Sequence, residues 1–216
     1  MIKLGKKLLL SIIVVNLLML YSCDKGGKTT EKTTDNNTNN PPQTPNILLI
    51  IADDMGQDAT PGFDIGSVKP VMPNLQSMID NGIRFTGLWA NPTCTPTRST
   101  IITGKYGFRV NVTKCGDLFD TSELILHKYL RDSAGYSDAV IGKWHLSNNP
   151  KHPQRIGVSY YAGLLTGTAT SYNDWTLTEN GEDSTSSEYI TTKLTDLAIE
   201  WLKQQQQNPW FLWLAY

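Results

Sequence analysis

The sequence has little of what marks a nucleic-acid-binding or a disulfide-rich protein. Its 216 residues carry 19 Lys and Arg against 20 Asp and Glu, so the formal net charge is −1. A nucleic-acid-binding domain usually has a strong cationic excess, and no such partner is expected here. Three cysteines are too few for a disulfide scaffold. Hydrophobic residues make up 39% of the chain, which is enough for one sizeable core and excludes wholesale disorder.

One long apolar run stands at the N-terminus. Residues 8–20 are almost wholly apolar and follow three lysines within the first seven residues. The run is too short to span comfortably a hydrocarbon layer of roughly 30 Å, so we predict that residues 1–22 are a signal peptide. An uncleaved anchor helix is the alternative.

The end of that run resembles a bacterial lipobox. Its last residues read Leu-Tyr-Ser-Cys, and the resemblance implies that Cys23 is lipidated and becomes the mature N-terminus. Residues 24–45 hold no large apolar side chain, so we predict that 23–45 form a lipidated, flexible linker. The protein is then exported and lipid-anchored in the bacterial cell envelope, in the periplasm or at the outer membrane, with the membrane as a partner.

Residues 46–216 alternate strand and helix patterns. We expect strands at 46–52, 83–90, 136–142 and 209–216, helices at 73–81, 96–103, 121–133 and 188–206, and a mostly irregular stretch at 143–186. The unalternated apolar run at 46–52 predicts a strand buried on both faces. The order predicts an α/β fold with a mostly parallel sheet flanked by helices.

The last expected strand, residues 209–216, ends with the sequence itself. Such an apolar strand belongs inside a sheet and normally leads into a further loop. We therefore expect a truncated domain, inactive or nearly so on its own. A compact domain closed by its terminal strand is the alternative.

Two adjacent carboxylates, Asp53 and Asp54, follow the first strand. Ligands of open α/β sheets gather at the carboxyl ends of strands. Both side chains reach one ion only if the backbone turns there, which Gly56 would permit. Hard oxygen ligands favour Ca²⁺ or Mg²⁺. A solvated loop with a helix cap is the other interpretation of the pair.

A cysteine and an arginine open the helix expected at 96–103. Pro96 suits a first helical turn and Thr95 can cap it, which places Cys94 at the positive end of the helix. Arg98 lies four residues later on the same face. Without further context, a disulfide between Cys94 and Cys115 is the favoured explanation of the cysteine.

A third cluster, Lys143-Trp144-His145, directly follows the strand expected at 136–142. In extended backbone the first and third residues share a face, so Lys143 and His145 should point together toward Asp53 and Asp54. A lysine binds the oxygens of an anion as a point charge, and a histidine accepts or donates protons. The alternative is a surface segment in which Trp144 packs into the core.

These clusters, in this order, resemble the sulfatase family. The motif Cys-x-Pro-x-Arg with Thr-Gly five and six residues after the arginine is similar to its signature, and PNILLIIADDMG, PNLQSMIDNGIRFTGLWA and IGKWHL are similar to other sulfatase segments. The similarity covers roughly residues 45–216 and implies the alkaline-phosphatase-like fold of the sulfatase N-terminal catalytic domain.

The resemblance also implies a chemistry and its residues. A formylglycine-generating maturation enzyme oxidises the cysteine of the motif, here Cys94, to formylglycine. Arg98, Lys143 and His145 then serve as catalytic residues, with Lys143 and His145 contacting the formylglycine. Asp53, Asp54 and residue 94 contribute to a Ca²⁺ site, with Mg²⁺ as the other candidate ion. In the family, an Asp-Asn pair completes the metal site, and a second His and a second Lys join the catalytic residues. All of these lie beyond the position that corresponds to Tyr216.

The function that follows is hydrolysis of sulfate esters of a small molecule or carbohydrate. Two alternatives stay open: a formylglycine-dependent phosphonate or phosphodiester hydrolase, and an inactive pseudoenzyme or binding lipoprotein in which Cys94 stays a thiol. Four aromatic residues after the third cluster either stack on a sugar ring or pack the loop, namely Tyr160, Tyr161, Tyr172 and Trp175.

Overall fold

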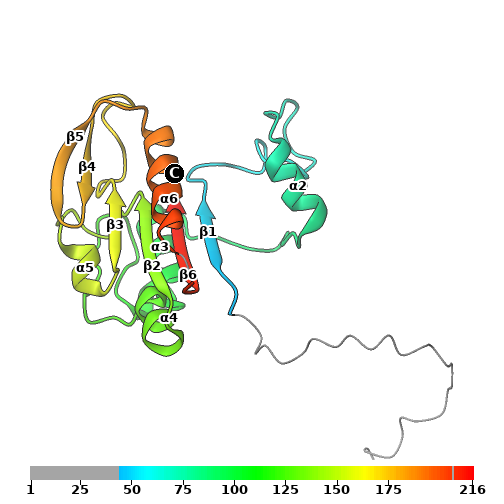
Figure 1. The fold of residues 1–216 in the computed structure, drawn as a ribbon. Coiled ribbons are helices and arrows are strands. Elements are labelled where there is room, and N and C mark those ends of the chain that lie inside the picture. The colour runs from blue at the N-terminus through cyan, green and yellow to red at the C-terminus, as the bar shows by residue number, and fades with distance from the viewer. Residues whose placement is uncertain (1–43, 206) are drawn as a thin grey trace, which may run out of the picture. The chain divides into compact units, whose positions relative to one another are not determined.

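The computed structural model describes residues 44–205 and 207–216. Residues 44–216 form one compact unit (Figure 1). The predicted signal peptide, the lipidation site at Cys23 and nearly all of the predicted linker lie outside the described residues. Within the described part of the chain, every helix is too short or too polar to cross a membrane.

A mixed sheet organises the described residues. Its strands follow the order β1-β6-β2-β3-β4-β5. Their bounds are β1 Ile47–Ile51, β2 Ser137–Gly142, β3 Tyr160–Gly163, β4 Trp175–Glu179, β5 Glu182–Ser186 and β6 Trp210–Ala215. The first three pairings are parallel and the last two antiparallel. The predicted α/β fold with a mostly parallel sheet and flanking helices is therefore confirmed.

The register of the parallel strands brings the expected clusters to one edge of the sheet. Ile51 of β1 pairs with Ala215 of β6, and Ala215 pairs with Gly142 of β2. The carboxyl ends of β1 and β2 therefore lie on either side of β6. Asp53 and Lys143 follow these ends closely, so the pairing places two residues 90 positions apart in sequence on the same side of the sheet.

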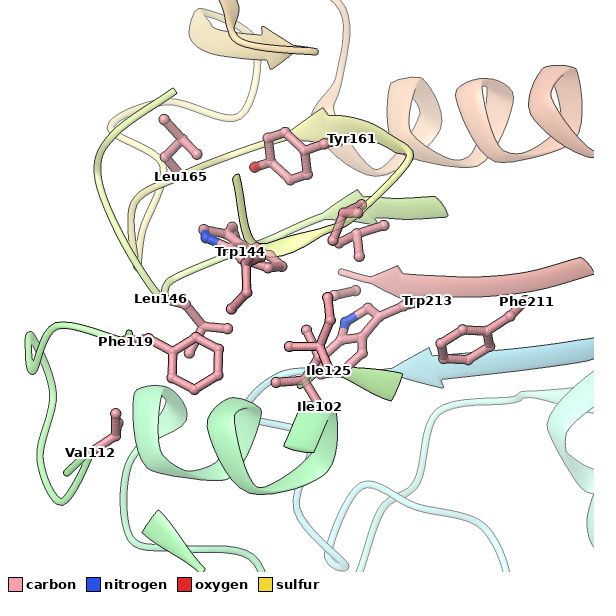
Figure 2. Packing of buried hydrophobic residues seen from close by; sticks show 14 of the residues in the cluster. Ile102, Val112, Phe119, Ile125, Trp144, Leu146, Tyr161, Leu165, Phe211 and Trp213 are labelled. Atoms are coloured by element: carbon pink, nitrogen blue, oxygen red, sulfur yellow. The ribbon is translucent and has the colours of Figure 1, made fainter. Parts of the chain in front are cut away.

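Helices cover both faces of the sheet. Their bounds are α2 Pro73–Asn81, α3 Cys94–Thr103, α4 Leu126–Ala134, α5 His152–Ile156 and α6 Ile190–Lys203, with a short 3₁₀ turn η1 at Gly107–Arg109. On one face, α6 buries Leu194, Ala198 and Trp201 against Leu212 and Leu214 of β6. On the other face, Ile102 of α3 and residues around α4 pack against Phe211 and Trp213, again from β6 (Figure 2).

Most of the predicted elements are confirmed with shifted bounds. The expected helix at 121–133 begins only at Leu126, and the one at 188–206 ends at Lys203. The stretch 143–186 is mostly irregular as expected, but it also contains one helix and three strands that were not predicted, namely α5, β3, β4 and β5. The expected strand at 83–90 was also wrong: no strand forms, and Ile83, Phe85 and Trp89 are 85%, 72% and 92% exposed. An apolar run makes a strand only where a neighbouring strand pairs with it, and none does so here among the described residues.

The first strand is an edge strand rather than a central one. Within the described sheet β1 pairs only with β6. Leu48 and Ile50 are each 47% exposed, so the prediction that both faces of this strand are buried was wrong. Ile47, Leu49 and Ile51 are partly buried against the α3 side of the core.

The connection from β1 to α3, which contains α2, buries few side chains. Helix α2 has no buried residue. Upstream of it, the ammonium of Lys69 lies 2.8–3.2 Å from four backbone carbonyl oxygens and shares its three N–H donors among them, namely those of Gln57, Asp58, Thr60 and Ile65. Hydrogen bonds to one lysine therefore hold this loop together, since few buried side chains do so.

Candidate functional site

A cleft of about 590 Å³ lies where β1 ends and α3 begins. The turn after β1 supplies Asp53 and Asp54 to its wall, the first turn and a half of α3 supplies Cys94 and Arg98, and the end of β2 supplies Lys143. The clusters expected from the sequence therefore meet in one cavity. Arg98 and Lys143 bring two cations to a cleft that contains a potential nucleophile.

Helix α3 begins at Cys94, two residues earlier than expected. Its N-cap is Thr93 in extended backbone, so the expectation that Thr95 caps the helix was wrong. Thr95 and Arg98 are instead buried within the helix. The helix ends as predicted at Gly104, whose φ of 67° is left-handed and lets its N–H bond the carbonyl of Thr100. Cys94 still lies in the first turn, at the positive end of the helix dipole.

Arg98 ties the helix to both strand ends. Its guanidinium is 3.1 Å from Asp53 Oδ2 and also donates to the backbone carbonyl of Lys143. The residue is 2% exposed. Burial lowers the pKa of Arg98, and the negative charge of Asp53 only partly offsets this effect. Because a planar guanidinium can hold two partners at fixed angles, Arg98 sets the distance between the ends of β1 and β2.

Asp53 is held between two cations. The Lys143 ammonium forms an ion pair with the same Oδ2 that Arg98 contacts. Burial raises the pKa of Asp53, but hydrogen bonding and charge from Lys143 and Arg98 outweigh it, so the pKa lies below its ordinary value. The carboxylate therefore stays ionised and available as a ligand to a cation.

The backbone turns at Asp54 rather than at Gly56. Asp54 has φ of 58°, in the left-handed region, whereas Gly56 is not among the positive-φ residues. The turn predicted for this pair thus occurs two residues before the glycine. A non-glycine residue in this region costs free energy of the order of 1 kcal/mol, and such strain concentrates at functional sites.

His145 faces Cys94. Its Nδ1 is 2.9 Å from Cys94 Sγ, and its own φ is 52°. Lys143 lines the cleft and His145 contacts Cys94. Because the backbone at His145 is left-handed, simple strand alternation is not the reason that both side chains lie here. Burial, then Lys143 and Arg98, lower the pKa of His145, so its imidazole is neutral at neutral pH and can accept a proton.

The Cys94 thiol is not activated as it stands. Burial raises its pKa, and the charge of Lys143 only partly opposes this. Catalytic cysteines depend on a lowered pKa that populates the thiolate at neutral pH. The surroundings of Cys94 therefore do not suit a cysteine acting as its own nucleophile.

Sequence reasoning missed two residues that contact the pair. Cys115, considered above only as a disulfide partner of Cys94, has its Sγ 3.9 Å from Cys94 Sγ and 3.6 Å from His145 Nε2, and both cysteines are free rather than bonded to each other. Gly167 packs on the imidazole of His145, because a Cβ built there would lie 2.4 Å from Cε1. Both residues belong to irregular segments without periodicity, so no sequence pattern pointed to them.

The other two histidines and two of the four aromatic residues named above are buried, whereas Tyr172 is 66% exposed. Trp144 is buried and donates its indole N–H to His152 Nδ1 at 3.1 Å, so this tryptophan does pack into the core while its neighbours serve the cleft. His127 is fully buried against Phe211, with ring centroids 4.5 Å apart. Tyr161 and Trp175 are buried at 0% and 3% exposure, which excludes stacking on a sugar ring in this structure.

Comparison with known proteins places this site in a family. The family model described as Sulfatase matches residues 45–216. The chain belongs to the sulfatase family. Human arylsulfatase G is 35% identical over 128 residues, which cover 56% of this chain and 24% of the human protein. N-acetylglucosamine-6-O-sulfatase from Bacteroides thetaiotaomicron is 30% identical over 170 residues, covering 77% of this chain and 29% of that enzyme.

A solved sulfatase structure has the same fold. It is described as a complex with its substrate D-glucosamine-2-N,6-O-disulfate, and it superposes with a TM-score of 0.69 at 28% identity over 79% of this chain and 34% of that one. This sulfatase chain therefore spans about a quarter to a third of the length of these three relatives.

The donors of this sulfatase fit part of a hard-cation shell. Asp53 and Asp54 supply carboxylate oxygens at the end of β1, as Ca²⁺ and Mg²⁺ prefer. Calcium usually takes six to eight oxygens, and no cluster of three or more acidic side chains occurs in the described ranges. The two aspartates would coordinate one side of such an ion. Asp53 is already ionised, as coordination of a cation requires.

Proposed function

We propose that this sulfatase chain hydrolyses sulfate esters through a formylglycine made from Cys94. The observation that carries the proposal is the contact of Cys94 Sγ with His145 Nδ1 at 2.9 Å, in a cleft that Arg98 and Lys143 also line. In the matured residue the Cys94 sulfur is replaced by oxygen, so Sγ marks the place of a formylglycine oxygen. The raised pKa of the unmodified thiol agrees with a nucleophile that requires maturation.

The proposed reaction divides one displacement into two steps. Hydrated formylglycine has two hydroxyls on one carbon. One hydroxyl releases its proton to solvent and its oxygen attacks the sulfur of the ester. The bond from sulfur to the alcohol oxygen breaks, and that oxygen takes a proton from solvent as the alcohol leaves. His145 then accepts the proton of the other hydroxyl, the aldehyde forms again, and sulfate leaves with the electron pair of the carbon–oxygen bond.

Each neighbouring residue has a proposed task in this sequence. Neutral His145 is placed to accept the hydroxyl proton. Lys143 offers a point charge to sulfate oxygens, and Arg98 positions Asp53 and the end of β2. Asp53, Asp54 and the formylglycine would hold Ca²⁺, or Mg²⁺, and such an ion would supply charge that stabilises the ionised diol.

We propose a sulfated carbohydrate as the substrate class. Support comes from two relatives, the one named N-acetylglucosamine-6-O-sulfatase and the solved structure described with D-glucosamine-2-N,6-O-disulfate. We also propose export and lipid anchoring through Cys23, on the strength of the leader sequence, and maturation by a formylglycine-generating enzyme.

Turnover tests the proposal. The chain, joined to any residues that its gene encodes after Tyr216, is produced with a formylglycine-generating enzyme. It is assayed on 4-nitrophenyl sulfate, a 6-O-sulfated glucosamine and a phenyl phosphonate ester. We expect hydrolysis of both sulfates and none by Cys94→Ser. Turnover of the phosphonate alone would establish the phosphonate hydrolase instead, and an inactive protein in which Cys94 stays a thiol would indicate the pseudoenzyme.

A further inference from the structure

Three metal-binding side chains converge beside the hard-oxygen donors. Cys94, Cys115 and His145 each offer one ligand atom, and these atoms lie within 4.8 Å of one another. Cys94 and His145 are half-buried and Cys115 is exposed, so solvent reaches the group. No other group of three such side chains occurs among residues 44–205 and 207–216.

The spacing of the sulfurs fits a shared ion better than a bond between them. A disulfide requires its sulfurs about 2.0 Å apart, roughly half the distance of 3.9 Å seen here. Two thiolates on a tetrahedral zinc, each at about 2.3 Å, are separated by about 3.8 Å. The ring nitrogen Nε2 of His145, at 3.6 Å from Cys115 Sγ, suits a third vertex of the same tetrahedron.

We propose that, before maturation, Cys94, Cys115 and His145 bind one thiophilic divalent cation, of which Zn²⁺ is the representative. The ion displaces the two thiol protons, takes one imidazole nitrogen and keeps a fourth position for water on the solvent side. This site shares residue 94 with the proposed calcium site but differs from it in donor chemistry, because sulfur and imidazole donors select soft ions and carboxylates select hard ones. Thr95 Oγ1, 3.6 Å from Cys115 Sγ, helps to orient that ligand.

The proposal has a consequence for maturation, which rests on the proposed function. Oxidation of Cys94 to formylglycine replaces its sulfur by oxygen and so removes one ligand. The thiophilic site and the formylglycine are therefore mutually exclusive states of residue 94. A bound zinc ion holds the thiolate and protects its carbon from oxidation, so metal occupancy would control how much of the protein matures.

Cobalt provides a direct spectroscopic test. The full chain carries Cys23→Ser, so that Cys94 and Cys115 are its two thiols, and is purified reduced from cells without a maturation enzyme. Titration with Co²⁺ is expected to give a thiolate-to-cobalt charge-transfer band at one equivalent, which Zn²⁺ abolishes. Binding of Co²⁺ only through oxygen, with no such band, would overturn the proposal.

Variants assign the band to these residues. Cys115→Ser should weaken Co²⁺ binding by more than the 10- to 100-fold typical of groups that only orient a ligand. Cys115→His, which restores a donor, should bind again with the band of one thiolate, and this rescue separates ligand loss from misfolding. Asp54→Asn is the matched control, because it alters the hard-oxygen donors and should leave the band unchanged. Persistence of the full band in Cys115→Ser would contradict the proposal.

A second arm connects the site to maturation. Protein loaded with Zn²⁺ is presented to the formylglycine-generating enzyme, and the Cys94 peptide is weighed. We expect less conversion with Zn²⁺ than without it, and no such difference in Cys115→Ser. Equal conversion in all cases would overturn the protective role. The cobalt spectrum gives its answer even if Cys94 is never converted, so failure of the metal site and failure of the sulfatase proposal are distinguishable.

Discussion

Helices α2 and α3 have similar sequence signals at their ends but differ in how deeply they are buried. They have nine and ten residues, each has a proline in its first turn, and each is followed by a glycine. Yet α3 buries five of its residues and holds Cys94 and Arg98 in the cleft, whereas α2 buries none. The difference teaches that caps and propensity form a helix, while packing against the sheet decides whether the helix can position a site.

The largest expected contrast concerns core packing. Ile102 of α3 is fully buried among Phe211, Trp213 and other side chains of the core (Figure 2). Ile102→Ala should lower the free energy of unfolding by about 2–5 kcal/mol, from lost burial and the cavity left behind. Urea denaturation measures the change. A loss below about 1 kcal/mol would mean that α3 is held no better than α2.

The buried part should also be sensitive to acid. Burial lowers the pKa of His127 from 6.5 to about 4. Between these values the unfolded chain binds a proton that the folded chain does not, so the free energy of unfolding falls as pH decreases from 6.5 to 4, by about 3 kcal/mol in total.

His127→Leu removes this titration and should flatten the pH dependence of stability over that window. Denaturant midpoints at a series of pH values measure it, with the exposed Tyr129→Ala of the same helix as a control. An unchanged slope in His127→Leu would show that other groups cause the acid sensitivity.

The positioning of His145 should depend on the absence of a side chain at residue 167. Gly167→Ala places a Cβ against the imidazole and must displace it. A shift of about 1 Å in a catalytic group can cost roughly 100-fold in rate, so we expect a fall of about 10- to 100-fold in kcat of the matured protein. Retention of full kcat would place the proton acceptor elsewhere. Gly87→Ala, where a Cβ meets no atom within 4 Å, is the matched control and should leave kcat unchanged.

The smallest effect is expected in α2. Met78 is 65% exposed, and Met78→Ala should change the free energy of unfolding by no more than about 0.5 kcal/mol. The same urea series as for Ile102→Ala measures it. A loss comparable to that of Ile102→Ala would show that α2 is buried in solution and would remove the contrast between the two helices.

The features that could be predicted from the sequence are those set by local patterns of residues. The apolar runs of β2 and β6 and the glycine-terminated helices were predictable because hydrophobic pattern and caps are local properties. The meeting of Asp53 with Lys143 followed from the rule that parallel strands present their carboxyl ends at one edge, whereas the place of Cys94 and Arg98 in the same cleft was implied by the family resemblance.

The errors arose where neighbours far along the chain decide the structure. Strand β5, Glu182–Ser186, is wholly polar and forms by pairing with β4. It could not be predicted from the sequence because it has no hydrophobic pattern. The run 83–90 has the composition of a strand without a partner in the described sheet. The contact of Cys115 with Cys94 depends on the path of an irregular loop, which sequence periodicity does not encode.

The mass of the peptide that contains residue 94 tests the central claim most directly. The chain is produced with a formylglycine-generating enzyme, digested and compared with Cys94→Ser produced in the same way. The account predicts a peptide in which the cysteine side chain has become an aldehyde, whose mass shifts further on reaction with a hydrazide. An unmodified Cys94 thiol from cells in which a known sulfatase is fully converted would contradict it.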